Sequence, residues 1–323
     1  FGEGDKAILF IKQTGSKEKL WTAKITDADG NTVRTYKWTD AAPNEITWNG
    51  TDDSNAIVKD GIYHYEITST DLAGNTSEKA QINNIFFSAE KPQTSIAISG
   101  ARFFAPEPKG EVAESRKDIR FDVSIPSPKA SVNKLVDWKI QVVAKNSDDV
   151  LYSLEGKDKA PESFVFNGKN SSGSYLADGE YRTKVTARYL NGYEPAPVYS
   201  PVFVIDNSAP DATVVLPEKI FNGQKLFAVT QQAVPEESFT GPKNWTGKII
   251  ASDGTVAREY EFGNNLPSKV EWNGLNKEGQ FADGAYTYVL EVTEPAGNKR
   301  TVTSDTFTLD TSTTVLAVSV RPD

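Results

Sequence analysis

Few residues in this sequence could carry out nucleophilic or acid–base catalysis at neutral pH. Among its 323 residues there is no cysteine, and the one histidine is His64. Such catalysis needs a nucleophile beside a base whose pKa lies near neutrality. Because His64 stands between Tyr63 and Tyr65, whose side chains we expect to point into a core, it should face the solvent. The sequence predicts no catalytic residue, so we expect the chain not to be an enzyme.

Paired carboxylates are the other catalytic possibility, because they hydrolyse glycosidic bonds without a histidine. The 44 aspartate and glutamate residues lie mainly in expected turns and at outward positions of expected strands. None stands on an apolar face, where burial would shift the pKa of a carboxyl group. We therefore interpret the acidic residues as a solvated surface.

Asp27 and Asp29 are the candidates for a metal site. The run Asp27–Asn31 resembles a calcium-binding loop superficially, but its glycine comes too early and its twelfth position is Trp38 instead of glutamate. A hairpin turn explains the same residues. The sequence predicts a structural turn without a metal, and a weak Ca²⁺ site at Asp27 and Asp29 is the alternative. Asp52-Asp53, in a later loop, is a similar case.

A pattern of recurring residues, which we call landmarks, occurs three times along the chain. Each copy has an upstream tryptophan, then a proline five residues before an aromatic residue, then Asn-Gly, and an Asp-Gly pair whose glycine follows 10 or 11 residues later. The upstream tryptophans are Trp21, Trp138 and Trp245, the aromatic residues are Trp48, Phe166 and Trp272, and the Asp-Gly pairs are Asp60-Gly61, Asp178-Gly179 and Asp283-Gly284. Landmarks that keep their spacing three times indicate an internal repeat.

Each landmark is typical of paired β-strands. Trp21, Ala23 and Ile25 alternate with polar residues, which places them on the buried face of a strand. Asn-Gly and Asp-Gly supply the positive φ that tight turns require. Leu72–Asn75 and Pro295–Asn298 are predicted hairpin tips before a last strand. The sequence therefore predicts an all-β chain of three tandem immunoglobulin-like or fibronectin-III-like β-sandwich modules.

The same pattern places the boundaries of the modules. We expect module 1 at residues 1–90, a divergent module 2 at 91–208, module 3 at 209–311 and the first strand of a truncated further module at 312–323. The connectors between modules are short and contain proline, which limits hinge motion more than a Gly/Ser linker would. We therefore expect an elongated arrangement, a monomeric rod.

Aromatic residues outside the repeated positions are the candidates for a binding surface, because exposed Trp and Tyr rings bind sugars. Trp48 and Trp272 recur at fixed strand positions and are expected in the core. The binding candidates are Trp38 with its neighbour Tyr36, and in the second module Phe103, Phe104, Tyr189 and Tyr193.

The landmarks together resemble the immunoglobulin-like domain of the flagellar hook-capping (hook scaffold) protein. In the first copy they read Trp, Asp-x-x-Gly, Pro-x-x-Φ-x-Trp-Asn-Gly, Asp-Gly-x-Tyr-x-Tyr and Ala-Gly-Asn in order along the chain. The second copy departs from them, since Phe166 replaces the tryptophan, Thr183 replaces the second tyrosine and the Ala-Gly-Asn tip is missing. The resemblance implies a non-catalytic exported scaffold, as in repeat-containing bacterial envelope and surface proteins.

Composition excludes some classes of partner. The net charge of −9 and the absence of a basic run disfavour binding to nucleic acid and to anionic membranes. No stretch approaches the roughly 20 apolar residues that span a bilayer. Gly2-Glu3-Gly4 lacks the preceding strand and the third glycine of a phosphate-binding loop, so no cofactor is expected. A cysteine-free chain of small β modules fits a bacterial exported protein and equally a cytosolic one.

The function expected from these observations is that of a structural scaffold of the bacterial envelope, in the periplasm or at the cell surface. It would space or present a neighbouring domain, such as a peptidoglycan-binding one, with a protein or cell-wall partner. The alternatives are an adhesin-like module that binds a glycan or protein, a flagellar hook assembly scaffold, and an accessory part of a larger enzyme. Fold alone does not decide among them.

Overall fold

The structure is a computed structural model that describes residues 1–127, 131–235, 241–313, 315–319 and 321. Its described residues form 24 strands and two short 3₁₀ helices, η1 (Gly4–Lys6) and η2 (Glu114–Arg116). Neither helix has the length that crossing a bilayer would require, and no other helix is found in the described part of the chain. The all-β fold class predicted from the sequence is confirmed.

The strands form three successive sets, which we call the first, second and third copy. The first copy consists of β1 (Leu9–Lys12), β2 (Glu18–Asp27), β3 (Thr32–Asp40), β4 (Glu45–Trp48), β5 (Gly61–Thr70) and β6 (Ala80–Phe87). The second consists of β7 (Ser95–Ser99), β8 (Phe103–Phe104), β9 (Ile119–Ser124), β10 (Leu135–Ala144), β11 (Val150–Lys157), β12 (Ser163–Phe166), β13 (Gly179–Tyr189), β14 (Val198–Tyr199) and β15 (Phe203–Ile205). The third consists of β16 (Ala212–Val215), β17 (Ile220–Phe221), β18 (Phe227–Ala233), β19 (Asn244–Ala251), β20 (Val256–Gly263), β21 (Lys269–Trp272), β22 (Gly284–Thr293), β23 (Lys299–Thr303) and β24 (Phe307–Leu309).

By its contacts the chain divides into two compact units. Unit 1 comprises Phe1–Ser99, Arg120–Phe164 and Arg182–Pro201, and unit 2 comprises Gly100–Ile119, Val165–Tyr181 and Val202–Asp323. Unit 1 thus holds the whole first copy and unit 2 the whole third copy. Each unit also holds part of the second copy, because the division passes through β12 and β13.

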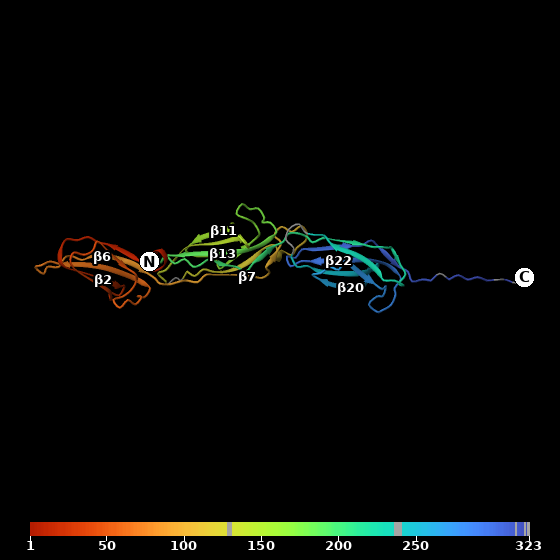
Figure 1. Cartoon of the computed structure of the whole chain (residues 1–323), viewed down its shortest axis with the longest axis horizontal. Coiled ribbons are helices and arrows are strands. Elements are labelled where there is room, and N and C mark those ends of the chain that lie inside the picture. Colours follow the sequence, from red (N-terminus) through yellow and green to blue (C-terminus); the bar gives the residue numbers. More distant parts are fainter. Residues whose placement is uncertain (128–130, 236–240, 314, 320, 322–323) are drawn as a thin grey trace. The chain divides into compact units, whose positions relative to one another are not determined.

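The first copy consists of a two-stranded sheet, β1-β4, and a four-stranded antiparallel sheet in the order β3-β2-β5-β6. Figure 1 labels β2 and β6 of the larger sheet. Trp21, Ala23 and Ile25 of β2 are buried between the sheets, as their alternation predicted. Trp48 of β4 packs edge-on against Tyr63 of β5, with ring centroids 5.1 Å apart. Tyr and Trp rings at the repeated positions therefore build the core, where aromatic side chains contribute large buried areas.

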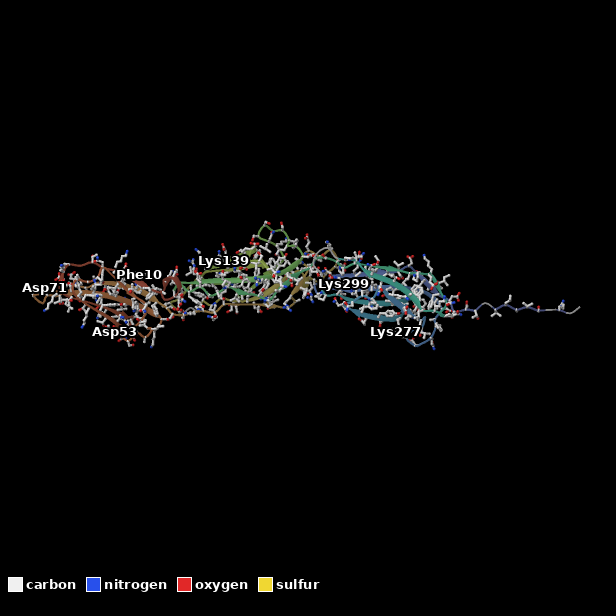
Figure 2. All side chains as sticks on the ribbon, viewed as in Figure 1. Phe10, Asp53, Asp71, Lys139, Lys277 and Lys299 are labelled. Atoms are coloured by element: carbon white, nitrogen blue, oxygen red, sulfur yellow. The ribbon has the colours of Figure 1, made fainter. Side chains whose placement is uncertain are left out.

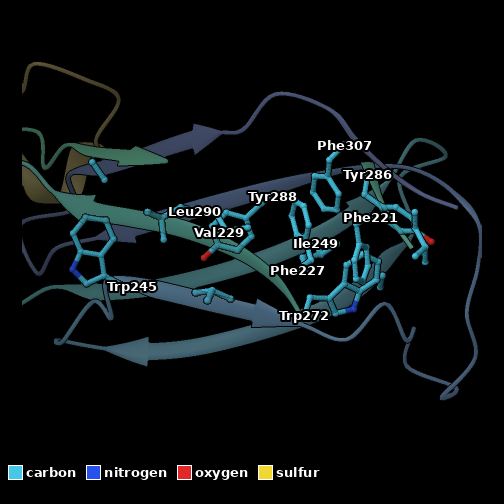
Figure 3. Close-up of a cluster of buried hydrophobic side chains, with 14 of the residues drawn as sticks. Phe221, Phe227, Val229, Trp245, Ile249, Trp272, Tyr286, Tyr288, Leu290 and Phe307 are labelled. Carbon is cyan, nitrogen blue, oxygen red and sulfur yellow. The ribbon is translucent and has the colours of Figure 1, made fainter. Parts of the chain in front are cut away.

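The third copy repeats this plan with additional strands. Its sheets have the orders β16-β18-β21 and β17-β24-β22-β19-β20, with β23 paired to β22. Figure 3 shows its core, in which Trp272 packs edge-on against Tyr286 at 4.9 Å and Phe227 stacks on Phe307 at 4.1 Å. Trp245 is buried beside Leu290 and Val292. The residues that recur in the sequence thus occupy the same places in both cores.

The second copy has a three-stranded sheet, β12-β9-β7, and a sheet in the order β11-β10-β13-β15-β8, with β14 paired to β13. Phe166 takes the place of the tryptophan and is buried. In both the second and third copies the last strand pairs in parallel with a short early strand, β15 with β8 and β24 with β17. The sequence did not predict these parallel pairs.

The segment 312–323, predicted to be the first strand of a further module, forms no strand among its described residues. Thr314, Val320, Pro322 and Asp323 lie outside the described residues. Val315, Leu316 and Val318 are each more than 80% exposed.

Candidate functional site

The residues considered for catalysis lie apart from one another. His64, half-buried on β5, places its Nδ1 3.0 Å from Oδ1 of Asn83 on the neighbouring strand β6. Within the part of the chain that the structure describes, no three His, Cys, Asp or Glu side chains gather as a metal-binding group.

Asp27 and Asp29 lie in the hairpin turn between β2 and β3. One oxygen of the Asp27 carboxylate accepts the backbone N–H groups of Asp29 (3.0 Å) and Asn31 (2.8 Å), and the other accepts the Asn31 side-chain amide at 3.0 Å. The Asn31 side chain and backbone hold the pKa of Asp27 below its usual value. The turn itself therefore uses the carboxylate oxygens that a cation would need, in the pattern of an Asx turn.

The expected exposed aromatic surface of the second copy was wrong for two of its four residues. Phe104, on β8, is 1% exposed and Tyr189, on β13, is 0% exposed. Tyr189 donates its hydroxyl hydrogen to the Pro126 carbonyl at 2.9 Å, and burial raises the pKa of this phenol to about 12. Phe103 and Tyr193 are half-buried. Phe104 and Tyr189 are core residues because the chain folds strands over positions that seemed irregular in the sequence.

Trp38 lies on β3 and is half-buried. Its ring stacks on that of Tyr36 at 5.7 Å, and both pack against the core of the first copy. An equivalent stack, Tyr260 on Phe262 at 6.0 Å, lies on β20 of the third copy. The first and third copies thus share an aromatic pair, at positions outside the landmarks that recur in all three copies.

A hydrogen-bond arrangement that the sequence did not predict recurs where the chain leaves each copy. The aspartate of each Asp-Gly pair accepts a backbone N–H from the residue two positions after the last strand: Asp60 from Ala89 (2.9 Å), Asp178 from Asn207 (2.8 Å) and Asp283 from Thr311 (3.0 Å). The residue before each of these, Ser88, Asp206 or Asp310, donates its own N–H to the carbonyl of Phe1, Phe104 or Phe221 respectively. The three connectors therefore begin with the same geometry.

In unit 1, a turn of the second copy holds the connector that follows the first copy. Asn191 is 2% exposed, and its side-chain amide donates to the carbonyls of Ser88 (3.0 Å) and Glu90 (2.9 Å). Its side-chain oxygen accepts the Tyr193 N–H at 3.0 Å. A β-carbon on Gly192, next to Asn191, would lie only 2.3 Å from the Glu3 carbonyl oxygen.

In unit 2, the corresponding turn of the third copy holds the next connector. Asn298, 2% exposed, donates its side-chain amide to the Asp206 carbonyl at 2.8 Å. Glu294, in the same turn, forms a buried ion pair with Lys243 at 3.0 Å. A β-carbon on Gly297 would lie 3.0 Å from Val112.

The two turns that hold connectors share one backbone conformation with a third turn, in the first copy. In each, the first residue donates its N–H to the carbonyl of the fifth, and a glycine with φ between +93° and +98° donates to the carbonyl of the first. The turns are Asp71–Asn75 in the first copy, Tyr189–Tyr193 in the second and Glu294–Asn298 in the third. The second copy therefore keeps the tip that its sequence seemed to lack. We call these three segments the docking turns.

The docking turn of the first copy has no such contact within the described residues. Leu72 is 87% exposed, and Figure 2 shows Asp71 at one end of the first copy. Asn75 donates to the Asp71 carboxylate at 2.9 Å, which holds the pKa of Asp71 below its usual value.

Comparison with protein families bears on the first copy. Residues 3–72 match the FlgD Ig-like domain. The resemblance predicted from the sequence is confirmed for these residues. No curated protein matches the chain.

Similar solved structures include parts of two adhesion proteins and a set of fibronectin(III)-like modules. A tetra-tandem repeat in the extending region of a large adhesion protein is 17% identical, with a TM-score of 0.35, covering 95% of this chain and 71% of that one. A 1.5-MDa bacterial ice-binding adhesin is 16% identical, with a TM-score of 0.35, covering 94% and 90%. The fibronectin(III)-like modules of CbhA from Clostridium thermocellum are 14% identical, with a TM-score of 0.31, covering 67% and 94%.

Proposed function

We propose that this chain is a non-catalytic spacer of the bacterial envelope that presents a neighbouring domain. The observation that supports this role best is the way the connectors are held. Each of the two connectors between copies is bonded by an aspartate of the preceding copy and by a buried asparagine of the following one. A connector fixed from both sides transmits position from one module to the next, which is what a spacer must do.

The repeated construction supports the same proposal. Equivalent buried side chains make the same hydrogen bond in two copies. The hydroxyl group of Tyr65 donates to Gln13 in the first copy, and that of Tyr288 donates to Gln231 in the third. The family match at residues 3–72 belongs to an Ig-like domain, a class that usually has no catalytic role. On this proposal the modules extend over 1–90, 91–208 and 209–311, and the protein acts after export, in the periplasm or at the cell surface.

Module exchange in the natural protein tests the spacer role. One variant deletes residues 91–208, and a second replaces them with an unrelated Ig-like module of the same length. The readout is the access of a labelled antibody to the neighbouring domain on intact cells. A spacer predicts that the deletion reduces access and that the unrelated module restores it.

Two outcomes would contradict the spacer role. If the unrelated module fails to restore antibody access to the neighbouring domain, and Trp38→Ala abolishes binding to a glycan or protein, the chain is an adhesin. If the deletion blocks assembly of the flagellar hook, it is a hook assembly scaffold.

A further inference from the structure

We call each docking turn, together with the connector that it holds, a joint, and the two joints differ in charge. In unit 1 the buried residue of the connector is Ser88, and the first residue of the docking turn is Tyr189. Burial raises the pKa of the Tyr189 phenol to about 12, so this side chain stays neutral in acid. In unit 2 the same two places hold carboxylates, Asp206 and Glu294, which are 1% and 6% exposed. At these places, therefore, the joint in unit 2 can change its charge between neutral and acidic pH, and the joint in unit 1 does not.

Glu294 is paired with a lysine inside the third copy. Its carboxylate oxygen Oε1 lies 3.0 Å from Nζ of Lys243, the residue directly before β19. The side chains of Glu294 and Lys243 are 1% and 13% exposed. Little solvent screens an ion pair at this depth, so each charge is stabilised in the interior mainly by charged and polar protein groups. Loss of the charge on Glu294 would leave Lys243 buried without this compensation, which is far less favourable than the intact pair.

The same carboxylate reaches the asparagine that holds the connector. Nδ2 of Asn298 lies 3.5 Å from Oε2 of Glu294 and donates to the Asp206 carbonyl at 2.8 Å. An asparagine side chain can present either its NH₂ group or its oxygen, and a carbonyl accepts only from the NH₂ group. An ionised acceptor beside Nδ2 favours the orientation that reaches the connector. Glu294 is thus a positioning residue that links the charge of Lys243 to the hold on Asp206.

Other charged groups lie around this docking turn. Arg116 of η2 lies beside it, and Arg300 of β23 forms an ion pair with Asp211 at 3.3 Å. Both side chains of the Arg300–Asp211 pair are about half exposed, so solvent screens their effect on the buried groups. The Asp206 side chain, by contrast, is buried on the connector. Acid acts on both buried carboxylates in the same direction, because protonation of either removes negative charge from the joint.

We propose that the joint in unit 2 is a latch that acid releases. While Glu294 is ionised, its contacts with Lys243 and Asn298 keep the docking turn on the connector. As the pH falls and Glu294 takes up a proton, Lys243 loses its counter-charge and draws in water, and Asn298 no longer holds the Asp206 carbonyl. The hold is therefore present at higher pH and lost as the pH falls. The inference goes beyond the proposed spacer role and does not depend on it.

Hydrogen exchange of the whole chain tests the latch, because backbone amides in both docking turns report on it. The amide of Gly297 donates to the Glu294 carbonyl, and that of Gly192 donates to the Tyr189 carbonyl. From about pH 7 to about pH 4, we expect the protection factor in the turn Glu294–Asn298 to fall at least about tenfold. The protection factor in the unit 1 turn should change by less than about twofold. Unchanged protection in unit 2, or an equal loss in both turns from acid unfolding of the chain, would overturn the proposal.

A charge-removing variant tests whether Glu294 is the group that titrates. Glu294→Gln keeps the shape of the side chain, and we expect its turn to lose protection at least about tenfold already at neutral pH, with no further loss in acid. The matched control is Glu291→Gln, which breaks a more exposed pair with Lys248 at 3.3 Å and should leave the pH dependence unchanged. Tryptophan fluorescence verifies that each variant is folded. If Glu294→Gln keeps the pH dependence of the natural chain, another group controls the joint and the proposal is wrong.

A double variant separates the effect of the unpaired lysine from that of a lost hydrogen bond. Lys243→Met combined with Glu294→Gln leaves no charge in the pair, so no uncompensated charge is buried. We expect the turn of the double variant to regain its protection and to keep it in acid. If the double variant is no better protected than Glu294→Gln alone, the buried lysine does not drive the release, which contradicts the latch.

Discussion

At the scale of single residues, the copies are distinguished by what surrounds the same hydrogen bond. Tyr288 donates to the side-chain oxygen of Gln231 at 2.7 Å, and Tyr65 donates in the same way to Gln13. Burial raises the pKa of both phenols. Gln231 is 1% exposed, but Gln13 lines a pocket and is half-buried. Removing the Tyr288 hydroxyl group therefore leaves the Gln231 side-chain oxygen buried away from water. Removing the Tyr65 hydroxyl group leaves the Gln13 side-chain oxygen accessible to water.

We expect Tyr288→Phe to lower the free energy of unfolding by about 1–3 kcal/mol, because the Gln231 oxygen then stays buried without a partner. Tyr65→Phe should lower it by less than about 1 kcal/mol, because water can reach Gln13. Denaturant unfolding followed by tryptophan fluorescence measures both. Equal losses would show that the two glutamines are equally desolvated.

At the scale of elements, the docking turns have one conformation in two environments. Gly74 and Gly192 both have φ of +93°, where a β-carbon is strained. Around Gly74 a β-carbon would meet no atom within 4 Å, whereas at Gly192 it would meet the Glu3 carbonyl oxygen at 2.3 Å. Replacing each glycine with alanine thus separates two contributions to the free energy of unfolding. Gly74 reports the strained backbone conformation alone, and Gly192 reports that conformation together with the close contact.

Gly74→Ala should cost about 1–2 kcal/mol of stability, from the left-handed conformation alone. Gly192→Ala should cost at least about twice as much, because the backbone of the Glu3 segment must also move. Hydrogen exchange of the amides in each turn, together with denaturant unfolding, measures the two effects. A cost at Gly192 no larger than that at Gly74 would contradict the close contact.

At the scale of the whole molecule, the sequence predicted the repeated framework and missed what joins it. Trp21, Tyr63 and Trp272 were placed in cores because local alternation determines which side of a strand is buried. The roles of Asn191 and Asn298 could not be predicted, since they depend on contacts with residues 92 or more positions away. In the second copy the turn is kept by backbone hydrogen bonds although Asn191-Gly192-Tyr193 replaces Ala-Gly-Asn. Phe104 was misjudged for the same reason, as a two-strand parallel pairing has no local signature.

The parallel pairing of β24 with β17 has a mechanical consequence. The N–H groups of Thr308 and Asp310 donate to the carbonyls of Lys219 and Phe221 at 2.8 and 2.9 Å. Tension applied to the entry and exit of the third copy pulls these two strands in opposite directions along their length, so the bonds share the load and must shear together. An antiparallel hairpin pulled at its open end yields one bond at a time.

Single-molecule pulling should therefore find that Asp310→Pro, which removes one of these donors, lowers the unfolding force of the third copy and leaves that of the first unchanged. The chain has no cysteine, so no disulfide joins β17 and β24. The parallel direction of these two strands is what we expect to resist force instead.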